Sequence, residues 1–164
     1  MFFEASIYAN QPTIPSPPRT LNSKPGSART CCANGGQHIL YLDDDEDLVS
    51  IVRRMLERSG FRVSSYTAQR EALAALRADP AAFDLFVTDY NMPGMSGVDV
   101  AREARLIRAD LPVGVASGFI SEGLQAECAA AGVTELIFKT NASEGLTGAI
   151  ERMASQVTEN LKPS

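Results

Sequence analysis

The chain has 164 residues, 45% of them hydrophobic, and a formal net charge of −5. This length suits one domain with a sizeable core, and the negative charge argues against direct binding of nucleic acid. With three cysteines in no zinc-like spacing, no secretory signal and no apolar run of 18 residues, we expect a cytoplasmic protein that does not contact a membrane.

The composition changes near residue 37. Upstream, the segments 11–18 and 22–27 are rich in proline and small polar residues. Such segments bury too little apolar surface to offset the entropy lost on ordering. We therefore predict a disordered tail or linker over 1–36, a folded domain over 37–155, and a flexible C-terminal tail over 156–164.

Within the folded part, short apolar runs alternate with stretches of helical periodicity. The predicted strands cover 39–42, 62–66, 85–88, 113–116 and 135–138. A first helix between the acidic loop and Gly60 would bury Leu48, Ile51, Val52, Met55 and Leu56, and later helices would cover 68–78, 98–108, 121–131 and 143–155. Five strand-and-helix pairs predict an α/β fold, with a parallel sheet covered by helices on both faces.

Two of the predicted strands end in carboxylates. Asp43 and Asp44 follow strand 39–42, and Asp89 follows strand 85–88. If these strands are neighbours, the three carboxylates crowd one crevice, where they repel one another unless a hard cation sits among them. The acidic run taken alone is more often a helix N-terminus, but the pair of strand ends favours a divalent metal site with Asp89 as a nucleophile.

Ser117 and Lys139 also fall just past predicted strand ends. Taken singly, they would be a turn residue and a surface lysine. Ligands of open parallel sheets bind at the carboxyl ends of the strands, so the shared placement favours one site. His38, the only histidine, precedes the first strand, and we expect a structural role for it.

In this order, the motifs resemble the receiver domain of two-component signalling over about 37–153. They are Leu42-Asp43-Asp44-Asp45-Glu46, Asp89-Tyr90-Asn91-Met92-Pro93-Gly94-Met95-Ser96-Gly97, Ser117-Gly118 and Lys139. The resemblance, which is strongest to receivers attached to hybrid histidine kinases, implies a (βα)5 doubly wound, five-stranded parallel sheet. Its strand order would be the flavodoxin-like 2-1-3-4-5.

The same resemblance implies the chemistry. A histidine kinase or phosphotransfer protein would pass a phosphoryl group to Asp89 with Mg²⁺ or Mn²⁺, and an unknown downstream protein would read the result. The domain would assist this transfer and its reversal without being an enzyme in the ordinary sense. The implied metal ligands are Asp44, Asp89 and the backbone carbonyl of Asn91, with Asp43 acting through water; Lys139 and the Ser117 hydroxyl would contact phosphoryl oxygens.

Two departures from the family pattern leave an alternative open. Thr140 stands where receivers usually have a proline, often in a cis bond, so we expect an all-trans loop there. Leu136 replaces a frequent aromatic residue, so switching should stay near the loops after Asp89 and Ser117. A phosphorylation-silent receiver that acts as a protein-binding module is therefore the main rival.

Other classes fit less well. An aspartate-nucleophile phosphatase of the haloacid dehalogenase type would need an aspartate where Asn91 stands. A nucleotide-binding module would need a glycine-rich loop where the acidic residues 43–46 stand. One further expectation concerns Phe119, whose apolar ring would shield a phosphorylated Asp89 from water.

Overall fold

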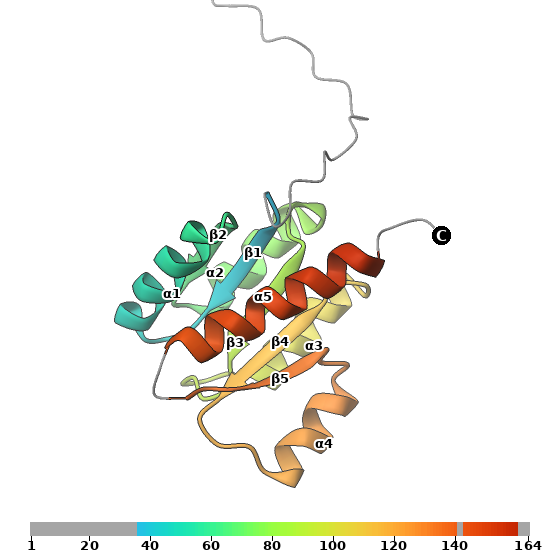
Figure 1. Ribbon diagram of the computed structural model, residues 1–164. Helices are drawn as coiled ribbons and strands as arrows, with labels where there is room; N and C mark the ends of the chain where they lie inside the picture. The colour runs from blue at the N-terminus through green and yellow to red at the C-terminus, as the bar shows by residue number, and fades with distance from the viewer. Residues whose placement is uncertain (1–35, 141–142, 161–164) are drawn as a thin grey trace, which may run out of the picture. The chain divides into compact units, whose positions relative to one another are not determined.

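The computed structural model describes residues 36–140 and 143–160, which contain one parallel sheet of five strands in the order β2-β1-β3-β4-β5 (Figure 1). Its strands are β1 (His38–Leu42), β2 (Arg62–Tyr66), β3 (Leu85–Asp89), β4 (Val113–Ser117) and β5 (Glu135–Phe138). The predicted fold class and strand order are confirmed. Within the described ranges, no helix is long and apolar enough to cross a membrane.

Helices connect the strands and cover both faces of the sheet. They are α1 (Glu46–Arg58), α2 (Gln69–Ala78), α3 (Gly97–Ile107), α4 (Glu122–Ala130) and α5 (Ser143–Asn160), with a short 3-10 helix η1 (Pro80–Ala82) before β3. Residues of α2, α3 and α4 pack in one hydrophobic cluster, and residues of α1 and α5 pack in a second cluster on the opposite face (Figure 1).

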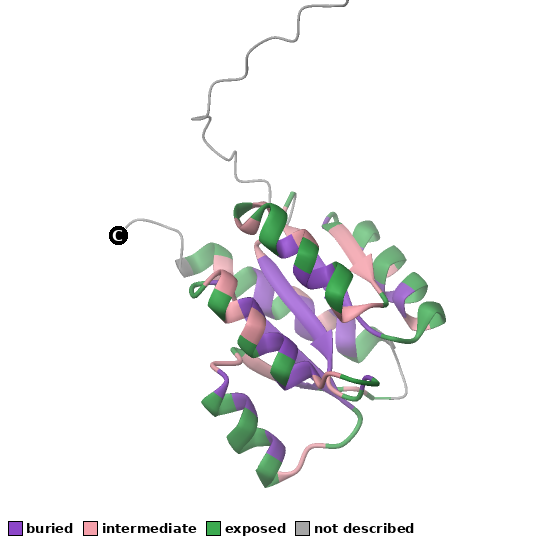
Figure 2. Ribbon diagram, turned by 180° about the vertical axis from the view of Figure 1, so that it is seen from behind, coloured by how far each residue is buried: buried purple, intermediate pink, exposed green. Residues whose placement is uncertain are grey.

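The interior strands carry most of the burial. Every residue of β3 and β4 is buried, and Figure 2 shows buried strands between helices that are exposed on their outer sides. Each fully buried aliphatic or aromatic side chain contributes about 1.5–3 kcal/mol relative to leaving it exposed. The continuous apolar runs in the sequence are the consequence, because a strand covered on both faces has no polar side.

Local sequence sets the helix ends. The Asp45 side chain accepts hydrogen bonds from the backbone N–H groups of Asp47 and Leu48 and so caps α1. Past the other end of α1, Gly60 has φ of +90°, a left-handed conformation that glycine adopts without the strain of a side chain. The predicted stop at Gly60 is confirmed.

Two predictions about helices were wrong. Ile51 was expected in the core but is 48% exposed, because Val49, Val52 and Leu56 form the stripe that faces the sheet. Consecutive residues on a helix point about 100° apart, so Ile51 turns away from that stripe.

The last helix ends five residues later than predicted, at Asn160 instead of 155. Gln37 holds its final turns, since Nε2 donates to the carbonyl of Ala154 at 2.9 Å and to Oγ1 of Thr158 at 3.1 Å. Residues 156–160 are therefore helical. The predicted tail over 1–36 lies outside the described residues except for Gly36, and 161–164 lie outside them too.

His38 joins three segments at the amino end of the sheet. Its ring nitrogens contact the carbonyl of Ala82 (3.0 Å) and Oγ of Ser64 (2.8 Å), and the ring lies 4.6 Å from that of Phe83. Because the carbonyl can only accept, Nδ1 carries the proton and Nε2 accepts from the serine hydroxyl. Burial, and then the nearby charge of Arg62, lower the pKa of His38.

This lowered pKa predicts a pH-dependent stability. The unfolded chain takes up a proton near the ordinary pKa of 6.5, while folded His38 resists it, so its contribution is complete above that pH and is lost as the pH falls below it. We expect the thermal midpoint of the wild type to fall more between pH 7 and 5 than that of His38→Gln. Parallel pH profiles for the two proteins would contradict this.

Candidate functional site

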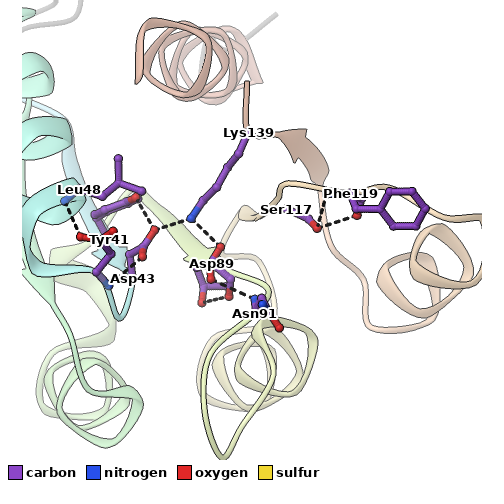
Figure 3. Close-up of polar contacts among 10 residues, drawn as sticks. Tyr41, Asp43, Leu48, Asp89, Asn91, Ser117, Phe119 and Lys139 are labelled. Carbon is purple, nitrogen blue, oxygen red and sulfur yellow. Dashed lines mark hydrogen bonds and ion pairs between the residues drawn. The ribbon is translucent and has the colours of Figure 1, made fainter. Parts of the chain in front are cut away.

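The carboxyl ends of the strands bring three charged residues together. Asp43 follows β1, Asp89 ends β3, and Lys139 follows β5. The Lys139 ammonium lies 2.6 Å from Oδ2 of Asp43 and 2.6 Å from Oδ1 of Asp89 (Figure 3). Because β4 separates β3 from β5, only a long side chain could cross the end of the sheet to reach both carboxylates.

Asp43 is a buried carboxylate that accepts hydrogen bonds from three donors. The residue is 1% exposed, which would be costly for an unpaired charge. Oδ2 accepts from the Tyr41 hydroxyl at 3.0 Å and from Lys139, and Oδ1 accepts from the backbone N–H of Asp45 at 3.1 Å. These three donors fix the orientation of Asp43 before any ligand arrives.

Tyr41 is the residue that sequence reasoning missed, because it was assigned only to an apolar strand. Its side chain is fully buried, and burial followed by the charge of Asp43 raises the pKa of its hydroxyl, so it remains a proton donor. A signal was present in the sequence: side chains two apart on a strand share a face, which places a tyrosine hydroxyl beside the following aspartate.

Asp89 is less completely paired than Asp43. Oδ1 contacts Lys139, and Oδ2 accepts from the backbone N–H of Asn91 at 3.0 Å. Burial has the largest effect on the pKa of Asp89 and, together with the charge of Asp43, raises it against the opposing hydrogen bond and charge of Lys139. Burial alone would lower the pKa of Lys139, but its hydrogen bonds to Asp43 and Asp89 outweigh that effect and raise it. Lys139 therefore stays charged, and Asp89 keeps lone pairs free for a further partner.

The carboxylates also suit a divalent cation. One oxygen each from Asp43, Asp44 and Asp89 lie within 4.8 Å of one another, and Asp44 is exposed to solvent. Oxygen ligands at such separations suit a hard cation such as Mg²⁺, which keeps several of its own waters. The donor set therefore fits the predicted metal site, with Asp44 open to an ion that arrives from solvent.

Ser117 lies at the same end of the sheet but faces elsewhere. Its hydroxyl donates to the carbonyl of Phe119 at 2.7 Å and accepts from the N–H of that residue at 3.2 Å. Phe119 is 76% exposed, and its ring points away from Asp89 (Figure 3). The ring therefore does not cover Asp89 in this structure, and the shielding of a phosphorylated Asp89 stays a prediction.

The two departures from the family pattern have local consequences. Leu136 is partly buried against the cluster formed by α2, α3 and α4. Oγ1 of Thr140 lies 2.6 Å from the position that a Cβ on Gly145 would take, so glycine lets the start of α5 approach Thr140. No cis peptide bond occurs in the described residues, as expected at Thr140, while 141–142 lie outside them.

Comparison with known proteins identifies the family. The profile of the response regulator receiver domain matches residues 39–151, which is more than half of the chain. The chain belongs to this family. Apart from His38 at the start of β1, the five strands of this receiver lie within the matched segment, as do Asp43, Asp89 and Lys139.

Individual proteins similar to this chain are also response regulators. The C4-dicarboxylate transport transcriptional regulatory protein DctD of Rhizobium meliloti is 32% identical over 70% of this chain, and the response regulator SaeR of Staphylococcus aureus is 33% identical over 46% of it. These matches span only 24% and 32% of the relatives' own lengths. The solved structure of Vibrio cholerae CheY4 has a TM-score of 0.66 and 27% identity, covering 72% of this chain and 98% of its own.

The different exposure of Asp43 and Asp44 generates a prediction for this receiver. Asp44→Ala should weaken Mg²⁺ binding by about tenfold or more, since it removes the accessible carboxylate. Asp43→Ala should weaken it less but lower the thermal midpoint, because the buried Tyr41 hydroxyl loses its acceptor. Calorimetric titration and thermal unfolding would measure both effects.

The matched control is Asp47→Ala, which removes the same charge from the first turn of α1, outside the carboxylate cluster. Its Mg²⁺ affinity should stay within about twofold of wild type, as screening of a solvent-exposed charge implies. A larger loss of affinity in Asp43→Ala than in Asp44→Ala would reverse the assigned roles.

Proposed function

We propose that this domain accepts a phosphoryl group on Asp89 in two-component phosphorelay signalling. The donor would be a histidine kinase or a phosphotransfer protein, which would place the domain in the cytoplasm, and a downstream protein would read the product. The contact of Lys139 with both Asp43 and Asp89 supports this most directly, because it sets a fixed positive charge beside Asp89, the less completely paired of the two carboxylates that it contacts.

In the proposed transfer, a carboxylate oxygen of Asp89 attacks phosphorus, and the bond from phosphorus to the donor's histidine nitrogen breaks. The electron pair of that bond returns to the imidazole, and an aspartyl phosphate forms. When bound, Mg²⁺ or Mn²⁺ would neutralise negative charge on the phosphoryl oxygens. Asp44, Asp89 and the Asn91 carbonyl would hold the cation directly, with Asp43 acting through water.

Lys139 has a second task in this scheme. Its ammonium now lies between two carboxylates, and formation of the acyl phosphate on Asp89 would remove one of those carboxylate charges. The ammonium could then pair with a phosphoryl oxygen while it keeps Asp43 as its other partner. Because Lys139 reaches both carboxylates even though Thr140 follows it, this arrangement supports a phosphoacceptor over a phosphorylation-silent binding module.

Ser117 would change its hydrogen bond after Asp89 is phosphorylated. Its hydroxyl would exchange the carbonyl of Phe119 for a phosphoryl oxygen, a charged and therefore stronger acceptor. The backbone N–H of Phe119 would then lose the Ser117 oxygen as its acceptor. Phosphorylation would thus remodel the loop after β4, while Leu136 offers no aromatic ring to carry the change farther.

The first test of this function is labelling. Incubation with acetyl phosphate and Mg²⁺ should add a single phosphoryl group, seen by intact mass spectrometry. Asp89→Asn should abolish the addition, because the amide is a poor nucleophile, and excess chelator should suppress it in the wild type. Asp79→Asn, an equal change at the exposed end of α2, should be labelled normally. Undiminished labelling of Asp89→Asn would refute the assignment.

A second prediction concerns the loop after β4. Beryllofluoride, a mimic of the phosphoryl group, should speed amide exchange at Phe119 in the wild type several-fold, as the Ser117 oxygen is withdrawn. In Ser117→Ala the Phe119 amide should exchange rapidly with or without the mimic. Hydrogen exchange read by NMR would measure this. Broad changes across β5 and α5 would contradict the proposed local response.

A further inference from the structure

Gln69, the first residue of α2, reaches out of its own helix to the loop between β3 and α3. Its Nε2 donates to the carbonyl of Pro93 at 2.9 Å and approaches the carbonyl of Met95 at 3.5 Å. This loop begins directly after Asp89 and contains Asn91. A side chain from the second helix therefore contacts the segment that carries one of the proposed metal ligands.

Backbone hydrogen bonds fix the two ends of this loop. The N–H of Tyr90 donates to the carbonyl of Ala116 at 2.7 Å, and the N–H of Gly97 donates back to the carbonyl of Tyr90 at 3.0 Å. Gly97 has no room for a side chain, since an added Cβ would come within 2.2 Å of the Asp89 carbonyl oxygen. The ends are thus held against the sheet.

The middle of the loop depends more on side chains. Asn91, Pro93 and Gly94 are exposed, while Met92 is buried in the core. The two carbonyls that contact Gln69 follow Asn91 by two and four residues. Gln69 therefore ties the exposed part of the loop to α2, which packs beside α3 on the same face of the sheet.

Gln69 does not serve its own helix in the usual way. The N-cap of α2 is Ala68, which makes no side-chain capping bond, so the helix begins without a side-chain acceptor for its first N–H groups. The amide of Gln69 donates to carbonyls of another segment. Its contacts are those of a brace between α2 and the loop that follows Asp89.

We propose that Gln69 is a positioning residue for the divalent cation. By holding the carbonyls of Pro93 and Met95, it keeps the loop in the conformation that presents Asn91 to the ion. This inference rests on the proposed function, in which the Asn91 carbonyl is a ligand. A loop that is ordered in advance loses less entropy when the ion binds, so the brace raises affinity without touching the ion.

The coupling must act in both directions. If Gln69 makes the loop favour the cation, the cation must strengthen the contact between the loop and Gln69 by the same factor. Binding of Mg²⁺ should therefore slow amide exchange in the first turns of α2, although α2 supplies no ligand. If Gln69 only stabilised the fold, Mg²⁺ would not change the rate of amide exchange in the first turns of α2.

The test replaces the donor while keeping the shape. Gln69→Glu places a carboxylate, which cannot donate, against two carbonyl oxygens, and Gln69→Ala removes the side chain. Each variant should bind Mg²⁺ roughly three- to tenfold more weakly in calorimetric titration, with Gln69→Glu the weaker, as expected for loss of a net favourable hydrogen bond. The slowing of exchange in α2 by Mg²⁺ should disappear in both.

The matched control is Arg77→Gln. Arg77 pairs with Glu103 at 3.1 Å and also joins α2 to α3, but it lies near the far end of α2 from Gln69. This variant should show wild-type affinity for Mg²⁺ and wild-type protection of α2. If the Gln69 variants match Arg77→Gln in both measurements, the inference is overturned.

The outcomes also separate this inference from the proposed function. A wild type that fails to bind Mg²⁺ would refute the metal site itself. Normal binding in the wild type with unchanged binding in the Gln69 variants would refute only the positioning role. Should Gln69→Glu fail to fold, Gln69→Ala carries the same comparison, and thermal unfolding without Mg²⁺ would report its integrity.

Discussion

The contact of one ammonium with two buried carboxylates is the constraint on which the site depends. Asp43 and Asp89 are 1% and 6% exposed, and without a cation between them their charges would repel in a region that water barely reaches. Lys139 supplies that cation from the far side of β4. The Lys139 ammonium already neutralises charge on Asp43 and Asp89. A metal ion or a phosphoryl group that binds there would change the local charge, so it would also change the contacts of Lys139.

The sheet holds the backbone of Asp43, Asp89 and Lys139 in place. Backbone hydrogen bonds continue past the strand ends, from Asp43 to Tyr66, from Tyr90 to Ala116 and from Lys139 to Ser117. The charged side chains therefore stand at strand ends where the backbone is still bonded to the neighbouring strand, and the Tyr41 hydroxyl donates to Asp43. The loops beyond these positions are more exposed, so they can change conformation while the charged residues stay in place.

Two kinds of loop surround the site. The loop after β3 is tied at both ends by its own backbone and in the middle by Gln69, so it resembles a prepared binding surface. The loop after β4 satisfies the Ser117 hydroxyl internally, so that this group must give up a good hydrogen bond before it can serve a ligand at Asp89. The loop after β3 is thus ordered before a ligand binds, whereas the Ser117 hydroxyl must change its hydrogen bond when a ligand binds. This combination suits a domain whose conformation depends on its ligand.

The sequence by itself determined the order of strands and helices, the placement of Asp43, Asp89 and Lys139 at strand ends, and the family to which they belong. These features follow from periodicity and from ordered motifs, which are local properties of the chain. The tertiary structure decided which atoms meet. The hydrogen bonds from Gln37 to α5, from Lys139 to Asp43 and from Gln69 to the loop after β3 join segments far apart in the chain, and the direction of the Ser117 hydroxyl depends on a side-chain rotation. Local patterns do not encode such contacts, because each is settled by how the packed elements are placed and oriented relative to one another.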